Sequence, residues 1–527
     1  MEMELQETTM ITAHAESSPT QIENGPNKVD AGLLPRDHYK NRLPLWRYEL
    51  RQLLLPLVRW ETPYLAWMQE HCRTPFLDSY FALTANLGTH TFFMIMLPLM
   101  FWFGYTSLGR GVVHVLASGV FFSGFLKDLF CLPRPLSPPL HRITMSGSAA
   151  LEYGFPSTHS TNAVSVALYG LLYLHSKPDI PINARIGTYI LATVYTFSII
   201  FGRLYCGMHG FLDVIVGIFL GAWLALMQWF LRDTFDHYVY GESFIPILII
   251  LVCIIVLVRI HPEPADACPC FDDGVAFAAV IGGVEIGNWH FAKTQWSWSE
   301  PVVGTVPYSF EQLGLAKTVA RVVLGILVIF LWREVSKPFF HFILPPVYRF
   351  IGRIGLLLPR RHFTSASEYK KVPRLPDDTL PSLSEIPSLM RSVRGARSDS
   401  VGPQSAADAY ETLAYREKRR RESQVSAAGP SNFDKYEQEM GTGYVDTSAL
   451  IRGNHDLEAL EEKSDNEEDE REVFKIIEPF KPRVRYDVEV VTKLVVYAGI
   501  AWWAVDGIPI IFELIGLGLG PQRQESR

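Results

Sequence analysis

Long apolar stretches recur along this chain and limit the folds it can adopt more than any other feature does. Residues 243–260 (SFIPILIILVCIIVLVRI) carry no charge before Arg259, which is about the run needed to cross a bilayer as a helix. Comparable stretches lie near residues 92–105, 112–126, 161–174, 185–201, 211–231, 275–289, 319–332 and 494–514. The pattern predicts an all-α, polytopic membrane bundle with about 8–9 transmembrane helices.

The segments between and around these stretches suggest a division into regions. Residues 1–48 are polar and should be disordered, whereas residues 49–75 have an amphipathic pattern that predicts an interfacial helix. A membrane domain follows over residues 76–335. Residues 336–490, basic and then densely acidic around Ser464, should form a largely disordered loop that phosphorylation could regulate. Residues 491–519 form the last predicted span.

Charge and cysteine content give weaker constraints. The net charge of −7 averages a basic N-terminal half with an acidic tail, and we expect no nucleic-acid partner. Residues 1–40 lack an apolar run before a cleavage site, so we expect no removable signal peptide. The six scattered cysteines predict no disulfide framework, and Cys268-Pro-Cys270 does not have the usual spacing of zinc ligands.

The first of three polar motifs lies between two predicted spans and contains Arg203, His209 and Asp213 (RLYCGMHGFLD). His209 and Asp213 are four residues apart, so on a helix they would share one face. A carboxylate that binds one imidazole nitrogen leaves the lone pair of the other free to act as a nucleophile. The alternative is a His–Asp pair that only stabilises a helix end.

The second motif, Pro156-Ser157-Thr158-His159, opens the predicted span that begins near residue 161. Helix N-termini favour anions, so Ser157 and the neighbouring backbone could bind a phosphate oxygen. His159 could protonate a departing alkoxide. The alternative is plain helix capping beside a bystander histidine.

The third motif contains Lys127 and Arg134 (KDLFCLPRP) at the end of a predicted span. Pro133 and Pro135 cannot continue a helix, so Arg134 should lie on a turn just outside it. A guanidinium there can bind phosphate through two hydrogen bonds, and Lys127 adds a point charge. The alternative is that both side chains snorkel to the membrane surface.

Together the motifs predict phosphoryl transfer at one face of the bundle. Lys127, Arg134 and Arg203 would offset the charge of a phosphate dianion. His209 would attack phosphorus to form a phospho-histidine, and His159 would protonate the leaving oxygen and later activate water. No carboxylate cluster of metal-binding type accompanies the motifs, so we expect no metal and no cofactor.

This constellation resembles the type 2 phosphatidic acid phosphatase superfamily (PAP2), which includes glucose-6-phosphatase and vanadium haloperoxidases. Its signature reads K-x6-RP, PSGH and SR-x5-H-x3-D. Thr158 and Gly202 replace the usual glycine and serine, and every spacing matches. The resemblance implies a six-helix catalytic core, His209 as nucleophile, His159 as general acid and base, and Asp213 orienting His209. It also implies phosphate binding by five residues: Lys127, Arg134, Ser157, Thr158 and Arg203.

The strings EYGFPSTHS (152–160) and RLYCGMHGFLDV (203–214) are similar to the sphingosine-1-phosphate phosphatase branch, and most similar to fungal-type long-chain base phosphatases. This resemblance implies hydrolysis of sphingoid-base 1-phosphates in the endoplasmic reticulum membrane, with a lumenal active site and with membrane lipids and the lipid substrate as partners. The alternatives are a phosphatidate or polyprenyl-diphosphate phosphatase, or a non-enzymatic membrane regulatory protein.

Orientation from charge conflicts with that expectation. Five basic residues precede the first span and argue for a cytosolic N-terminus, namely Lys40, Arg42, Arg47, Arg51 and Arg59. If only the apolar stretches named above cross the membrane, the three motifs lie on the same face as this segment. Among other polar residues in the spans, Glu285 and Asn288 should pair inside the bundle, and Asp506 and Glu513 should lie near interfaces.

Overall fold

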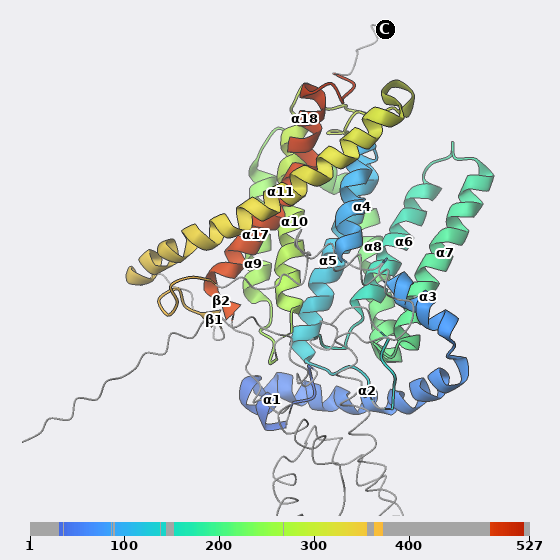
Figure 1. Cartoon of the computed structure of the whole chain (residues 1–527), viewed down its shortest axis with the longest axis vertical. Helices are drawn as coiled ribbons and strands as arrows, with labels where there is room; N and C mark the ends of the chain where they lie inside the picture. The colour runs from blue at the N-terminus through green and yellow to red at the C-terminus, as the bar shows by residue number, and fades with distance from the viewer. Residues whose placement is uncertain are drawn as a thin grey trace, which may run out of the picture.

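The computed structural model describes residues 31–34, 36–85, 87, 90–137, 139–143, 152–266, 268–355, 363–372 and 485–520. Long helices lie side by side in a bundle, and two helices lie across one end of it (Figure 1). The helices in chain order are α1 (Arg36–Arg42), α2 (Leu45–Cys72), α3 (Pro75–Ala85), α4 (His90–Trp102), α5 (Thr106–Phe130), α6 (Thr158–His175), α7 (Ile182–Tyr205), α8 (Phe211–Val239), α9 (Ile245–Ile260), α10 (Cys270–Phe291), α11 (Phe310–Arg353), α17 (Asp487–Trp502), the π-helical turn η3 (Trp503–Gly507) and α18 (Ile508–Leu514).

Within the described residues, five helical segments are long and apolar enough to cross a membrane, and they identify a multi-pass membrane protein. These are α5, α7, α8, α11 and the continuous segment Asp487–Leu514. Helices α4 and α9 are apolar but shorter. Helix α7 exposes large apolar side chains such as Ile190, Leu191 and Phe197, which suits a surface that faces lipid. The helical bundle is as predicted, and the full count of eight or nine spans remains a prediction.

Helix α5 forms the centre of the bundle and is the most deeply buried of the candidate spans. It packs against α6 and α8 on one side and against α4 and α10 on the other. The largest apolar core lies among α4, α5, α10 and α17, around Trp102, Leu116 and Phe512. Motif residues at the end of α5 are therefore held by a rigid central element.

Two glycines bring α8 against the start of α6. A Cβ on Gly217 would lie 2.7 Å from the Ser157 carbonyl oxygen, and one on Gly221 would lie 2.3 Å from that of Thr161. Both distances are far inside van der Waals contact, so only glycine permits this approach. The Gly-x-x-x-Gly spacing thus places the beginning of α6, which carries the second motif, beside α8, which carries the end of the first.

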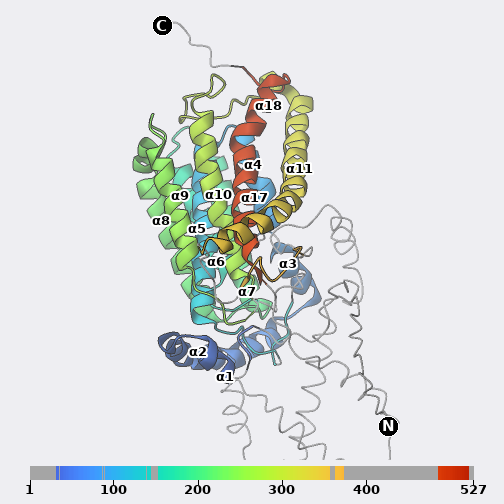
Figure 2. The same ribbon diagram turned by 90° about the vertical axis from the view of Figure 1, so that its left-hand side faces the viewer.

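Helix α2 lies across the end of the bundle at which α5 ends and α6 begins, and both views agree on this placement (Figures 1 and 2). Arg47 donates to the carbonyls of Asp128 and Leu129, and Arg51 donates to that of Cys131. Both guanidiniums are buried. The interfacial helix predicted over residues 49–75 therefore packs on the loops that carry the motifs.

Two bounds differ from the sequence prediction. Helix α1 and the first residues of α2 lie within residues 1–48, which were expected to be disordered, because buried Tyr39 and Tyr48 anchor this segment. Helix α11 continues past residue 335 to Arg353 with Pro338, Pro345 and Pro346 inside it. Most of the predicted loop, including Ser464, lies outside the described residues.

The described residues on either side of that loop meet. Strand β1 (Phe363–Thr364) pairs in parallel with β2 (Arg485–Tyr486), with Phe363 opposite Arg485. The Asp487 carboxylate also accepts a hydrogen bond from the Ala366 backbone N–H at 2.8 Å. The entry to α17 is thereby fixed close to the end of α11.

Candidate active site

The three motifs meet at one end of the bundle. The first motif runs from the end of α7 into the start of α8, the second opens α6, and the third begins in the last turn of α5 and continues beyond its end. These helices alternate in direction, so all four ends lie beside α2 (Figure 1). The sequence prediction that the motifs share a face therefore agrees with the arrangement of the helices.

Lys127 and Arg134 point at the same carboxylate. The Lys127 Nζ lies 3.0 Å from Glu152 Oε2, and the Arg134 Nη2 lies 3.2 Å from the same oxygen. Both cationic side chains are almost fully buried, whereas the Glu152 side chain is 27% exposed. Two buried cations that share one partly exposed anion form a site that a phosphate could enter.

Arg134 also contacts the predicted nucleophile. Its Nη1 donates to the Met208 carbonyl at 2.7 Å and lies 3.2 Å from His209 Nε2. The Met208 carbonyl fixes the guanidinium, so it presents a donor to the ring nitrogen that faces the cations. A phosphate bound to Arg134 would therefore lie next to His209 Nε2.

The other ring nitrogen of His209 has a defined partner. Nδ1 lies 2.9 Å from the Gly154 carbonyl oxygen, which can only accept, so Nδ1 carries the proton and Nε2 carries the lone pair. The closest Asp213 oxygen is 3.6 Å from Nδ1, and it accepts instead from the Gly210 backbone N–H at 2.9 Å. Gly154 therefore fixes the tautomer, and Asp213 lies within ion-pair range of Nδ1 while it holds the loop that carries His209. That Asp213 orients His209 remains a prediction.

Electrostatics keep His209 neutral. Burial lowers the pKa of His209 well below its usual value, and the charges of Arg134, Lys127, Arg203 and His159 lower it further. A neutral imidazole with a free Nε2 is the form required of a nucleophile. All four of these charged side chains therefore lie close enough to the His209 ring to influence its pKa.

Glu152 is held ionised by the same cations. Burial alone would raise the pKa of Glu152, but the charges of Lys127 and Arg134 outweigh that effect and hold it at about 2. His159, in the first turn of α6, also lowers the pKa of Glu152. His159 is partly exposed, as a group that exchanges protons with substrate and water must be.

Ser157 and Thr158 both have hydrogen-bond partners within the protein. Ser157 is the N-cap of α6, and its Oγ accepts from the Ser160 backbone N–H and hydroxyl at 3.3 and 2.9 Å. The Thr158 hydroxyl lies 2.9 Å from that of Ser123 on α5. The capping alternative therefore describes Ser157, and a phosphate contact by either hydroxyl remains a prediction.

Arg203 lies in the last turn of α7 and is buried. Among the described residues its Nε has no hydrogen-bond partner, which leaves a donor for a bound anion. Arg142, buried and bonded to the Pro135 carbonyl, lies within electrostatic range of Arg134 and was not singled out from the sequence.

Two carboxylates near the site were also missed. Glu152 follows no spacing rule, although its place four residues before Pro156 in a cationic site was a signal. Glu61 on α2 accepts from the Leu212 backbone N–H at 2.8 Å and so caps α8 next to His209. Only the tertiary contact of α2 with α8 reveals this role.

Polar residues deeper in the bundle have partners of their own. Glu285 pairs inside the bundle as predicted: it lies 2.6 Å from His114 Nε2 and accepts from the Tyr240 hydroxyl at 2.8 Å. Asp506 is fully buried and pairs with His290 at 2.8 Å, and its predicted position near a membrane interface remains a prediction. Asn288 is buried and has no hydrogen-bond partner for its side chain among the described residues, contrary to the predicted pairing.

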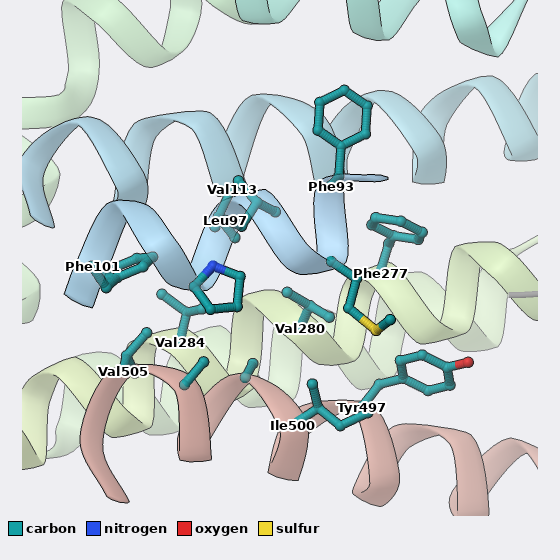
Figure 3. A pocket seen from close by; sticks show the side chains of 14 residues that line it. Phe93, Leu97, Phe101, Val113, Phe277, Val280, Val284, Tyr497, Ile500 and Val505 are labelled. Carbon is teal, nitrogen blue, oxygen red and sulfur yellow. The ribbon is translucent and has the colours of Figure 1, made fainter. Parts of the chain in front are cut away.

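A separate apolar pocket lies among α4, α5, α10 and α17, lined by residues such as Phe93, Val113 and Tyr497 (Figure 3). Val113 precedes Lys127 by 14 residues on α5, which corresponds to about 21 Å along the helix. The cavity lining carries no charged side chain. It can take hydrocarbon but not the phosphate.

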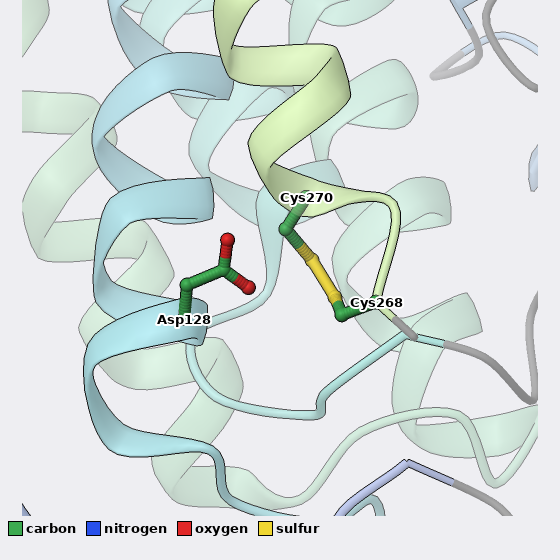
Figure 4. A group of neighbouring side chains, drawn as sticks. All are labelled: Asp128, Cys268 and Cys270. Atoms are coloured by element: carbon green, nitrogen blue, oxygen red, sulfur yellow. A yellow bond between two sulfur atoms is a disulfide. The ribbon is translucent and has the colours of Figure 1, made fainter. Parts of the chain in front are cut away.

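Cys268 and Cys270 form a single disulfide at the start of α10, which the scattered cysteine spacing did not predict. The Asp128 carboxylate points toward them from α5, one residue after Lys127 (Figure 4). With both sulfurs joined, neither thiolate is free to bind a metal. The disulfide lies at the same end of the bundle as the three motifs.

Comparison with known proteins agrees with this geometry. The model of the PAP2 superfamily matches residues 108–236, a stretch that contains all three motifs. A dihydrosphingosine 1-phosphate phosphatase of Schizosaccharomyces pombe is 41% identical over 319 residues, covering 60% of this chain and 75% of that protein. The chain belongs to the PAP2 superfamily.

Other PAP2 relatives have related names. A dihydrosphingosine 1-phosphate phosphatase of Saccharomyces cerevisiae is 33% identical, covering 61% of this chain and 78% of its own. Human sphingosine-1-phosphate phosphatase 2 is 28% identical, covering 50% and 66%. No solved structure matches the chain. The predicted resemblance to PAP2 proteins and to fungal long-chain base phosphatases is confirmed.

Proposed function

We propose that this PAP2 protein is a lipid phosphatase that hydrolyses sphingoid long-chain base 1-phosphates to the free base and phosphate, as a step of sphingolipid metabolism. The names of the relatives support the substrate class. The observation that carries the chemistry is His209, whose Nδ1 is bound to the Gly154 carbonyl while Nε2 lies 3.2 Å from Arg134. This arrangement aims a lone pair at the place where the cations would hold phosphorus.

In the first step the phosphate binds to Lys127, Arg134 and Arg203. His209 Nε2 attacks phosphorus, the N–P bond forms, and the bond from phosphorus to the ester oxygen breaks. His159 gives its proton to that oxygen, so the free base leaves as an alcohol. The cations stabilise the charge that develops on the transferring group.

In the second step His159, now neutral, takes a proton from water. The hydroxyl oxygen attacks phosphorus, the N–P bond breaks, and His209 returns to its neutral form as phosphate leaves. All the groups that this cycle uses are side chains of the chain itself. We therefore propose a metal-independent phosphomonoester hydrolase without a cofactor.

We further propose that the protein lies in the endoplasmic reticulum membrane with its active site on the lumenal side and a six-helix catalytic core within eight or nine spans. Two of the basic residues that argue for a cytosolic N-terminus, Arg47 and Arg51, are buried and bonded to backbone carbonyls. These two arginines are explained by their contacts within the protein, so they are weaker evidence that the N-terminus lies in the cytosol. The Cys268–Cys270 disulfide at this end suits an oxidising compartment.

The function is tested with the purified full chain in detergent. We expect hydrolysis of dihydrosphingosine 1-phosphate to exceed that of phosphatidate and of a polyprenyl diphosphate, and to persist in a metal chelator. His209→Ala should lower kcat on the order of 10⁴-fold, because the covalent step needs Nε2. His175→Ala, at the far end of α6 and exposed, is the matched control and should leave kcat unchanged.

Each contrary result has a defined meaning. A clear preference for phosphatidate or the diphosphate would assign the protein to another lipid phosphatase activity of the superfamily. An unchanged rate in the His209→Ala variant would remove this residue from the nucleophile role. No turnover of any of the three lipids by the wild-type protein would favour a non-enzymatic regulatory protein.

A further inference from the structure

Glu152 holds a position that simple phosphate binding does not explain. Its Oε2 lies 3.0 Å from Lys127 Nζ and 3.2 Å from Arg134 Nη2, and its backbone carbonyl accepts from Arg134 Nε at 3.2 Å. A carboxylate therefore stands against the two cations that a substrate phosphate would bind. An ionised carboxylate repels a phosphate dianion, so its presence weakens phosphate binding unless the ligand offsets it.

The two sides of this ion cluster differ in freedom to move. Arg134 is buried and fixed by the Met208 carbonyl and by its contact with Glu152 O, and Lys127 is 3% exposed. The Glu152 side chain is 27% exposed. When a phosphate binds Lys127 and Arg134, the Glu152 carboxylate is the part of the cluster that is able to turn toward the incoming ligand.

The ligand that suits such a site carries a cation next to its phosphate. A sphingoid-base 1-phosphate has an ammonium on the carbon adjacent to the one that bears the phosphate ester, whereas phosphatidate has no cation there. Each group of that zwitterion would meet an opposite charge, since the phosphate faces Lys127 and Arg134 and the ammonium faces Glu152. Charge-assisted hydrogen bonds of this kind are the stronger ones in proteins.

We propose that Glu152 binds the substrate ammonium while Lys127 and Arg134 bind its phosphate, so that the site selects amino-alcohol phosphates over phosphate esters without a cation. This inference rests on the proposed function and names the residue that sets its specificity. Glu152 has two effects: it attracts the ammonium, and it repels phosphate esters that carry no positive charge.

The test compares two substrates that differ in this charge, dihydrosphingosine 1-phosphate and its N-acetylated analogue, in which the amide is neutral; the effect of the added acetyl group is the same for the wild type and the variants, so the change in the ratio is the readout. For the wild-type protein we expect kcat/KM to favour the free amine by about tenfold or more, the usual worth of a hydrogen bond between charged groups. In the Glu152→Gln variant this ratio should fall toward one. Phosphatidate hydrolysis should rise relative to that of the free amine.

A structural role predicts something else. If Glu152 only positions Lys127 and Arg134, then Glu152→Gln lowers kcat/KM for both substrates by the same factor and leaves their ratio unchanged, and that result overturns the inference. The matched control is Glu61→Gln, a second buried carboxylate, which caps α8 and has no contact with the cations. It should lower both rates in parallel.

Further outcomes keep the two proposals apart. A wild-type protein that hydrolyses both substrates equally overturns the role of Glu152 without any variant, while the phosphatase activity stands. A wild-type protein that hydrolyses neither overturns the proposed function instead. If Glu152→Gln does not fold, Glu152→Asp retains the charge and should keep a preference for the free amine.

Discussion

At the scale of single residues, the chemistry depends on which nitrogen of His209 is free. The sequence motif predicts that Asp213 decides this; the Gly154 carbonyl accepts from Nδ1 at 2.9 Å, and Asp213 lies 3.6 Å from Nδ1 and accepts from the Gly210 N–H. A backbone carbonyl lies outside any motif that side-chain spacing can reveal. Asp213 therefore stabilises the loop around the nucleophile.

The depressed pKa of His209 gives a testable pH dependence. His209 attacks only when neutral, and burial followed by the charge of Arg134 lowers its pKa well below the usual value. An ordinary histidine has a pKa of about 6.5. The loss of activity on acidification should therefore begin well below that pH. In Arg134→Gln the His209 pKa should rise, so the acid limb of kcat/KM should move to higher pH.

The measurement is the pH profile of kcat/KM for both proteins, and kcat itself should fall about 10²-fold or more in the variant because a phosphate donor is lost. An acid limb that stays at the same pH in Arg134→Gln would contradict the electrostatic coupling. Arg185→Gln, a guanidinium change on α7 away from the site end, is the control and should leave the limb in place.

Sequence reasoning found the cations and both histidines because their spacing and their location at span ends are readable from the chain. It missed Glu152 because one carboxylate in a loop has no spacing partner. It assigned Ser157 to phosphate because capping and anion binding use the same residue types at a helix start. Only the position of its hydroxyl, against Ser160, separates the two uses.

At the scale of elements, the approach of α6 and α8 decides whether the motifs meet. The Gly217 and Gly221 contacts allow backbone to lie on backbone. Apolar periodicity predicted both helices but could not say which faces touch. The same is true of helix α2. Its amphipathic pattern predicted a helix at the membrane surface, but it could not predict the polar contacts that Glu61 and Gln69 make near the site.

Substitution at Gly221 tests this contact. Gly221→Leu would force α6 and α8 apart, because even a Cβ would lie 2.3 Å from the Thr161 carbonyl oxygen. We expect destabilisation of about 1–3 kcal/mol or more and a loss of activity larger than the loss of folded protein. The checks are thermal unfolding in detergent and kcat per folded molecule.

Gly170 on α6 offers the matched control, since a Cβ there meets nothing within 4 Å. Gly170→Ala should leave kcat unchanged and stabilise the helix by about 0.5–1 kcal/mol. Equal effects of the two substitutions would contradict the idea that the close approach at Gly221 positions the motifs.

At the scale of the whole molecule, the catalytic end and the C-terminal helix α18 lie at opposite ends of the bundle, and α1 lies at the catalytic end (Figures 1 and 2). Hydropathy predicted a polytopic bundle, because a backbone in lipid must form helices. It could not give the span count, since α6 and α10 carry polar side chains that face the bundle interior and α4 and α9 are short.

The proposed lumenal orientation is tested with glycosylation acceptors placed at the two ends of the chain. An acceptor before α1 should be glycosylated in microsomes, and one placed after Gly520 should not, because the two positions lie on opposite sides. The reverse pattern would place the active site in the cytosol. Modification of both acceptors would place both on the lumenal side. That result requires an even number of membrane crossings between them, which contradicts the bundle topology.

The pairing of β1 with β2 has a consequence for the acidic stretch that leaves and rejoins the bundle there. Because Phe363 and Arg485 are paired, the 121 residues between them begin and end next to each other. Lengthening such an excursion costs only a logarithmic entropy term. Insertions, deletions or a single protease cut in it should therefore leave the last helix docked and the hydrolytic machinery intact.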